Sequence, residues 1–452
     1  MKQKLLTTLC ILFICSTARA DILDSYIAQG LSNNLALKQK SISLEQSIQA
    51  LHQARGMFLP SVSLDARYSR AGGGRMIEIP IGDLMNPVYS TLNQLLTQVG
   101  QPALFPENLQ NQSVPFLREK EQDTKIRVVQ PLFQPAIYRN YKIRSDQRGM
   151  QEAEVGIFKR QLISDIHEAY FNYLKTVRVV ALLDQTNNLL KENVRVSESL
   201  FRNQKITEEG VFSARAELSA LEQQRADAQK SQTMAAAYFN FLLNRPLDVS
   251  IDILDVEADN AFKLIPLADA LALARSHREE FQLVNHGIDA AYHGVRLAGS
   301  SFLPGVTGVF DYGYQGEKYK FTPDDDYWMA SVVLNWNFFN GFQDKAKRNQ
   351  AVLEKTKLET QLMELENQIQ LQVKEAHENV RVAQLAIAST RDRVTSARKS
   401  FQLTQKKYTL GMVPPIEYRN ARHDLTEAEL QAIIAVYDYH IQAARFERVI
   451  AK

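Results

Sequence analysis

The side chains best suited to catalysis or metal binding are scattered along this chain of 452 residues. His167-Glu168 is not followed by a second histidine at the spacing of a zinc-protease helix. His286 and His293 lie seven residues apart on one helical face, but no third ligand is evident in the sequence. We therefore expect this pair to face solvent, and we expect neither a metal site nor a cofactor. Serine-hydrolase, paired-cysteine and nucleotide-binding motifs are absent, so the chain is not predicted to be an enzyme.

Apolar residues at the second of two helix reversals favour binding of another protein instead; the first reversal is more polar, so the two are not equivalent. Gly411 suits the left-handed end of one helix, and Pro414-Pro415 suit the turn into the next. Exposed apolar side chains at such an end indicate a docking surface. The predicted docking residues are Gly411, Met412, Val413, Pro414, Pro415 and Ile416 at the second reversal, and Gln204, Ile206 and Thr207 at the first.

A long helix precedes the second reversal. From Asp344 to Tyr408 apolar residues follow heptad steps, and neither Pro nor Gly occurs between Phe342 and Leu410. One row of this seam is bulky and the other is small, which suits close packing of a partner helix. At 1.5 Å per residue the helix is about 100 Å long, so we expect it to bridge a distance rather than to form a globule.

The chain contains an internal two-fold repeat. Phe58-Leu59-Pro60 recurs 244 residues later as Phe302-Leu303-Pro304, whereas Arg215 matches Arg422 at a displacement of 207. The difference locates an insertion in the first copy. Each copy has the order helix, strand, loop, strand, long helix and return helix. The predicted parts are a first repeat over 21–246, a linker or equatorial segment over 247–266, and a second repeat over 267–452.

Residues 1–20 have the features of a signal peptide. A basic start, the apolar run Leu5 to Cys15 and the site Ala18-Arg19-Ala20 fit removal on export. Lipidation at Cys15 is not expected, because Ile14 precedes it where a small residue is needed. The mature chain would have no cysteine, and its 50 basic and 51 acidic residues give no indication of nucleic-acid binding.

Four stretches alternate between apolar and polar residues: about 62–69, 124–132, 306–315 and 328–338. Their length and period suit transmembrane β-strands. A half-buried soluble sheet has the same alternation, but the aromatic residues at strand ends and the export signal favour a membrane. The predicted membrane-interface aromatics are Tyr68, Tyr314, Trp328 and Trp336.

Four strands cannot close a barrel, and open edges are not tolerated in hydrocarbon. Two copies would give eight strands and three would give twelve, so we expect an oligomer in contact with outer-membrane lipid. The twelve-stranded arrangement leaves more room for a lumen. The predicted lumen residues are Asp65, Arg67, Asp311 and Asn335. The loop over 70–123 is either a plug at the outer mouth or a variable surface loop.

Over essentially the whole mature length, the chain resembles the TolC-like outer-membrane efflux family. The resemblance rests on the repeat, the Phe-Leu-Pro phrases, the heptad hairpins, and Tyr408-x-x-Gly411 followed by Asn420-Ala421-Arg422. It implies a homotrimer with a shared twelve-stranded β-barrel in the outer membrane, continued through the periplasm by an α-barrel of antiparallel coiled-coil hairpins. It also implies opening by a periplasmic adaptor (membrane fusion protein) and an inner-membrane pump of resistance-nodulation-division or ABC type.

The resemblance also implies roles for individual tip residues. Family members carry acidic residues six and nine places after the tip glycine, where this chain has Glu417 and Asn420. Three copies of Glu417 would make a cation-selective constriction, whereas a solvated carboxylate at a helix start is the alternative. Tyr408 is either a gate residue or one more seam residue. The family's tip arginine is Val413 here, which leaves open what holds the tip closed.

Three function classes follow. An export duct explains the signal, strands, helices and repeat together, with multidrug efflux, metal efflux and type I secretion all open. A periplasmic coiled-coil scaffold or adaptor without a pore explains the helices but not the strands. An enzyme explains none of these features.

Overall fold

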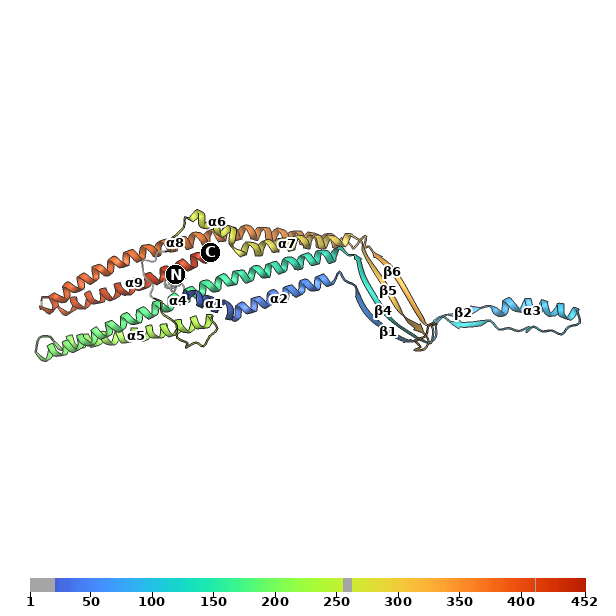
Figure 1. Cartoon of the computed structure of the whole chain (residues 1–452), viewed down its shortest axis with the longest axis horizontal. Helices are drawn as coiled ribbons and strands as arrows, with labels where there is room; N and C mark the ends of the chain where they lie inside the picture. The colour runs from blue at the N-terminus through green and yellow to red at the C-terminus, as the bar shows by residue number, and fades with distance from the viewer. Residues whose placement is uncertain (1–20, 255–261, 411) are drawn as a thin grey trace, which may run out of the picture. The chain divides into compact units, whose positions relative to one another are not determined.

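The computed structural model describes residues 21–254, 262–410 and 412–452. The predicted signal peptide, Gly411 and the middle of the predicted linker lie outside these ranges. The chain divides into a helical unit, formed by residues up to 51, 142–295 and 349–452, and a strand unit, formed by 52–141 and 296–348. Figure 1 labels the elements of both units.

Two long helices dominate the helical unit. Helix α4 has 68 residues and α8 has 67, and each is followed by a return helix of 35 residues. The predicted helix from Asp344 to Tyr408 is confirmed as α8, with one residue more at each end. None of the described helices combines the length and the apolar content that crossing a membrane requires. The helices are α1 (Asp21–Asn33), α2 (Leu35–Gly56), α4 (Pro135–Arg202), α5 (Glu208–Leu242), α6 (Leu267–His277), α7 (Glu279–Gly299), α8 (Gln343–Thr409) and α9 (Pro415–Val449).

The heptad seam is buried within the chain in the middle of α8. Val373 and Val380 are fully buried in a cluster that also contains Phe446 of α9 and Ala270 of α6. Farther toward the reversal, Val394 is only half-buried. The chain therefore provides its own partner helix for this seam, and its packing loosens toward the tip.

The predicted linker packs against the helices where it is described. Asn240 Nδ2 donates to the carbonyls of Leu247 and Val249, both at 2.9 Å, and Ile251 is buried. After the undescribed residues, Tyr439 OH donates to the carbonyl of Phe262 at 3.1 Å. Both described ends of the linker therefore belong to the helical unit.

The strand unit contains a four-stranded antiparallel sheet in the order β1-β4-β5-β6. All four predicted strands are present. The last one ends at Asn335 rather than at 338, so Trp336 lies beyond it, and its indole N–H donates to the carbonyl of Phe302 at 3.2 Å. The strands are β1 (Ser61–Arg70), β4 (Lys120–Phe133), β5 (Gly305–Gly316) and β6 (Asp326–Asn335).

The insertion between β1 and β4 is an ordered substructure. It contains β2 (Met76–Ile79), α3 (Ile81–Gln98) and β3 (Gln112–Pro115), and it extends from one end of the four-stranded sheet (Figure 1). Asn93 is almost fully buried; its amide donates to the carbonyl of Phe105 at 2.9 Å and accepts from the backbone N–H of the same residue at 3.1 Å. The helix is thereby tied to the segment that returns beside it.

Candidate functional site at the hairpin tips

The first reversal closes α4 with a left-handed residue that is not glycine. Gln204 has a φ of 57°, and its N–H donates to the carbonyl of Phe201 at 2.8 Å. The next amide, that of Lys205, donates to the carbonyl of Leu200 at 2.9 Å. This pair of bonds is the Schellman arrangement, in which the left-handed position is usually glycine because a Cβ is disfavoured there.

Gln204→Gly is therefore expected to stabilise the first tip by about 1 kcal/mol. Amide hydrogen exchange over 199–206 should slow by roughly fivefold, as that free energy implies. Gln204→Ala is the control, since alanine keeps the Cβ and should give no protection. Equal exchange in wild type and the glycine variant would show that the left-handed residue is unstrained.

The second reversal presents apolar side chains to solvent. The amide of Met412 donates to the carbonyl of Lys407 at 2.8 Å, and α9 begins at Pro415, as the double proline predicts. Met412 and Ile416 are exposed, whereas Val413 is half-buried. The exposed apolar surface expected at this tip is present, although its role in docking stays a prediction.

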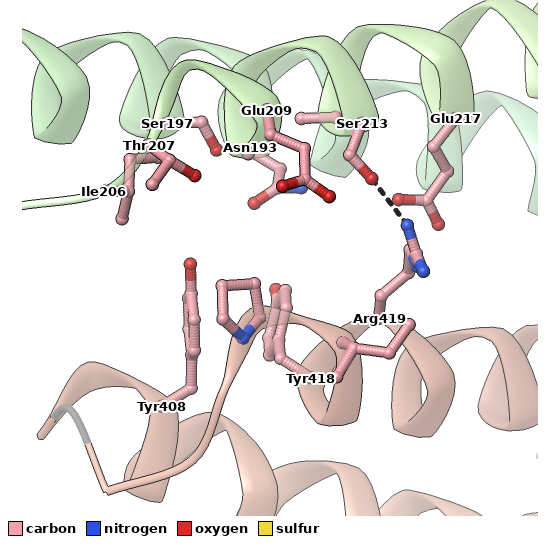
Figure 2. Close-up of a pocket in the computed structure, with 14 residues that line it drawn as sticks. Asn193, Ser197, Ile206, Thr207, Glu209, Ser213, Glu217, Tyr408, Tyr418 and Arg419 are labelled. Carbon is pink, nitrogen blue, oxygen red and sulfur yellow. Dashed lines mark hydrogen bonds between the residues drawn. The ribbon is translucent and has the colours of Figure 1, made fainter.

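The two tips enclose a cavity of about 410 Å³ within the helical unit (Figure 2). Tyr408 stacks on Tyr418 with ring centroids 4.8 Å apart, and Figure 2 shows Tyr408 directed toward Ile206 and Thr207 of the opposite tip. Burial raises the pKa of both tyrosines, so both hydroxyls stay protonated at neutral pH. Tyr408 thus lies between the two hairpins, so its contacts would change if the hairpins moved apart. The predicted gate role stays a prediction.

Two arginines of α9 join the hairpins. Arg419 Nη1 donates to Ser213 Oγ at 2.5 Å, the dashed line in Figure 2, and Arg422 forms an ion pair with Glu217. The Arg422 side chain is 5% exposed, and burial lowers its pKa to about 10, which leaves it charged at neutral pH. Sequence analysis did not identify these links, although Arg419 and Arg422 are one turn apart and Ser213 and Glu217 are likewise one turn apart.

Glu417 and Asn420, the predicted constriction residues, are exposed and do not line this cavity. Tyr418 and Arg419, which lie between them in sequence, line it. Glu417 and Asn420 therefore lie on a different face of α9 from Tyr418 and Arg419. That face is turned away from the cavity that Tyr408 lines.

The strand register separates a charged face from an apolar face. Asp65 lies opposite Lys125, and Arg127 lies opposite Asp311. Arg127 donates two bonds to Asp311, at 2.8 and 2.7 Å. Lys125 and Arg127 were not among the predicted lumen residues, although their alternation with Ile126 in the sequence was an available signal.

The predicted lumen residues Asp65, Arg67, Asp311 and Asn335 share the charged face by register. One expectation is wrong in detail: Asp311 is fully buried beneath β4 side chains and does not itself reach solvent. Tyr68, Tyr314 and Trp328 lie on the opposite face, together with Val62 and Leu64.

The expectation of a solvent-facing histidine pair is also wrong. His293 is only 18% exposed, and its Nε2 lies 3.9 Å from Asp146 Oδ2. His286 lies in a cluster with Asp146 and Asp289. Asp146 belongs to α4, more than a hundred residues away, so its proximity could not be inferred from the spacing on α7.

Comparison with known proteins agrees with this fold. Residues 270–452 match the family model described as outer membrane efflux protein. The outer membrane protein TolC of Salmonella enteritidis is 18% identical over 437 residues, which is 94% of this chain and 80% of that protein. Residues 270–452 therefore have the sequence pattern of outer membrane efflux proteins.

Solved structures share the architecture of this chain. The Campylobacter jejuni CmeC outer membrane channel superposes with a TM-score of 0.78 at 15% identity, over 95% of this chain and 85% of that one. The outer membrane protein VceC of Vibrio cholerae gives 0.78 at 13% identity, over 95% of both chains. The predicted fold class, long helical hairpins with an antiparallel sheet, is confirmed.

The relative and the two solved structures named above are all described as outer-membrane proteins. CmeC is further described as a channel.

Proposed function

We propose that the protein is the passive outer-membrane duct of a tripartite export system and acts as a homotrimer. One observation carries this proposal: the four-stranded sheet has an apolar face, a charged face and, in the described residues, unpaired outer edges on β1 and β6. In hydrocarbon those edges need partners. Three copies supply twelve strands and a closed wall.

The exposure of the two faces supports the same assembly. Val62, Leu64 and Val332 are 67%, 70% and 72% exposed on the apolar face. Exposed aliphatic side chains in a row of this kind suit lipid, and the face with Asp65 and Arg67 suits a water-filled lumen. The aromatic side chains of Tyr68 and Trp328 extend the apolar face and suit the membrane interfaces.

The helical tips supply the regulated end of this duct. The ion pair of Arg422 with Glu217 and the bond from Arg419 to Ser213 hold the two hairpins of one chain together. In this proposal an adaptor engages the exposed side chains of Met412 and Ile416, and engagement by adaptor and pump separates the hairpins. Cargo selection belongs to the pump, because a passive duct binds its cargo weakly; small-molecule efflux and type I secretion both fit.

The assembly is tested by the mass of the purified protein in detergent together with planar-bilayer recordings. A mass three times that of the chain, with conductance from the same fraction, is the expected result. A monomer that forms no pores in lipid would contradict the proposal.

Glu417→Ala is expected to lower the cation preference of the pore, because three carboxylates on a narrow axis attract cations. The cation-to-anion permeability ratio, measured from reversal potentials in a salt gradient, should fall by roughly threefold or more. Asn420→Asp should raise the ratio by adding a second ring of charge.

Asp424→Ala is the matched control, because Asp424 is another exposed carboxylate on α9. It should leave the ratio unchanged. An unchanged ratio in Glu417→Ala would remove Glu417 from the constriction.

A further inference from the structure

Helices α4 and α7 bring together a set of side chains that the duct does not use. The ligand-type atoms of Asp146, His286 and Asp289 all lie within 4.8 Å of one another. His293, one further turn along the same face of α7, approaches Asp146 at 3.9 Å. Two carboxylates and one imidazole therefore converge at one point of the helical unit, and a second imidazole lies beside Asp146.

The cluster lacks internal partners for its buried atoms. Asp146 Oδ2, His286 Nδ1 and His293 Nδ1 are each buried without a hydrogen-bond partner among the described residues. Burial raises the pKa of Asp146, opposed by the nearby histidines. Buried polar atoms are nearly always paired, so three unpaired ones at a single place point to a missing ligand.

The backbone of α4 makes room for this arrangement. A Cβ at Gly149 would lie 2.7 Å from the ring of His286, a distance that real Cβ atoms essentially never show. Glycine at this position lets the imidazole lie directly against α4, one turn from Asp146. Any larger residue at Gly149 would therefore force the His286 ring to move.

We propose that Asp146, His286, Asp289 and His293 bind one divalent transition-metal ion, for which zinc is the best fit. Zinc takes four nitrogen and oxygen ligands in a tetrahedron, with neighbouring ligand atoms about 3.4 Å apart. To reach that geometry, the ligand atoms of Asp146, His286 and Asp289, now within 4.8 Å of one another, would move closer together, and His293 would turn toward them from beside Asp146. Two imidazoles exclude magnesium and calcium, which require oxygen ligands.

Charge and position support the same ion. Two carboxylates neutralise a divalent cation, and the exposed Asp289 leaves a route from solvent. Because Asp146 lies on α4 and the other three residues on α7, the ion would clamp these two helices. The proposal is independent of the export function, since it concerns binding within the helical unit alone.

The test is calorimetric titration of the full-length protein in detergent with zinc chloride after chelator treatment. Wild type should bind one zinc ion per chain, and His286→Ala and Asp146→Asn should each weaken binding by about 100-fold. His52→Ala is the matched control, because His52 is an exposed helical histidine outside the cluster, and it should bind like wild type.

Thermal unfolding separates metal binding from a structural role of the same residues. Zinc should raise the Tm of wild type and of His52→Ala, but not that of Asp146→Asn. With chelator present, Asp146→Asn should unfold at or above the wild-type temperature, since it removes a buried unpaired carboxylate. Absence of zinc binding in wild type, or equal affinity in wild type and His286→Ala, would overturn the proposal.

Discussion

Arg422→Ala is expected to separate the hairpin tips and to raise the single-channel conductance of the proposed duct. Arg422 and Glu217 form an ion pair between α9 and α5, and the arginine is almost fully buried. Removing one partner of a buried pair costs about 3 kcal/mol or more, because the other charge is left unpaired. If the pair exists only in the closed tip, that cost shifts the closed-to-open ratio by roughly 100-fold.

Controls distinguish loss of a lock from loss of structure. Glu217→Ala should open the pore as well, and the double variant should be no more open than either single variant, since both remove the same interaction. Arg419→Ala should act more weakly, because it removes a bond to a neutral hydroxyl. Wild-type conductance in Arg422→Ala, with normal trimer yield, would show that the pair does not restrain opening.

The elements of this fold could be predicted because their signals are local. The helix from Gln343 to Thr409 carries an uninterrupted heptad pattern, so its ends were predicted to within one residue. The strands alternate with period two, and the error at β6 arose because Trp336 and Phe338 continue the alternation after pairing ends at Asn335. The alternation of residue types therefore predicts that a strand forms, whereas the residue at which the strand ends depends on where its hydrogen-bond partners end.

The site contacts could not be predicted, because they depend on which helices pack together. Arg422 and Glu217 lie on different hairpins, and Asp146 approaches His286 only because α4 lies against α7 at Gly149. No periodicity within one helix specifies its neighbour. Asp311 shows the same limit in the sheet: its face was predicted correctly, but its burial depends on Arg127 of β4.

Tyr170→Ala is expected to destabilise the helical unit by about 3–5 kcal/mol, the range for removing a large, fully buried aromatic side chain. Tyr170 has no exposed surface, and its ring lies 5.5 Å from that of Phe239 and 6.0 Å from that of Tyr26. Its hydroxyl donates to the carbonyl of Asp252 at 2.9 Å, so the same side chain also holds the linker. Denaturant unfolding followed by circular dichroism measures the loss.

Tyr170→Phe separates the two roles of this side chain. It keeps the ring and removes the bond to Asp252, so it should cost only about 1 kcal/mol. Limited proteolysis within 247–254 should nevertheless become faster, because the linker loses one of its anchors. Equal stability of the alanine and phenylalanine variants would mean that the hydrogen bond, rather than ring packing, stabilises this part of the core. Burial raises the pKa of Tyr170 to about 12, above the ordinary value of 10.0, so the hydroxyl is protonated in the folded and the unfolded chain between pH 6 and 9, and neither effect should depend on pH there.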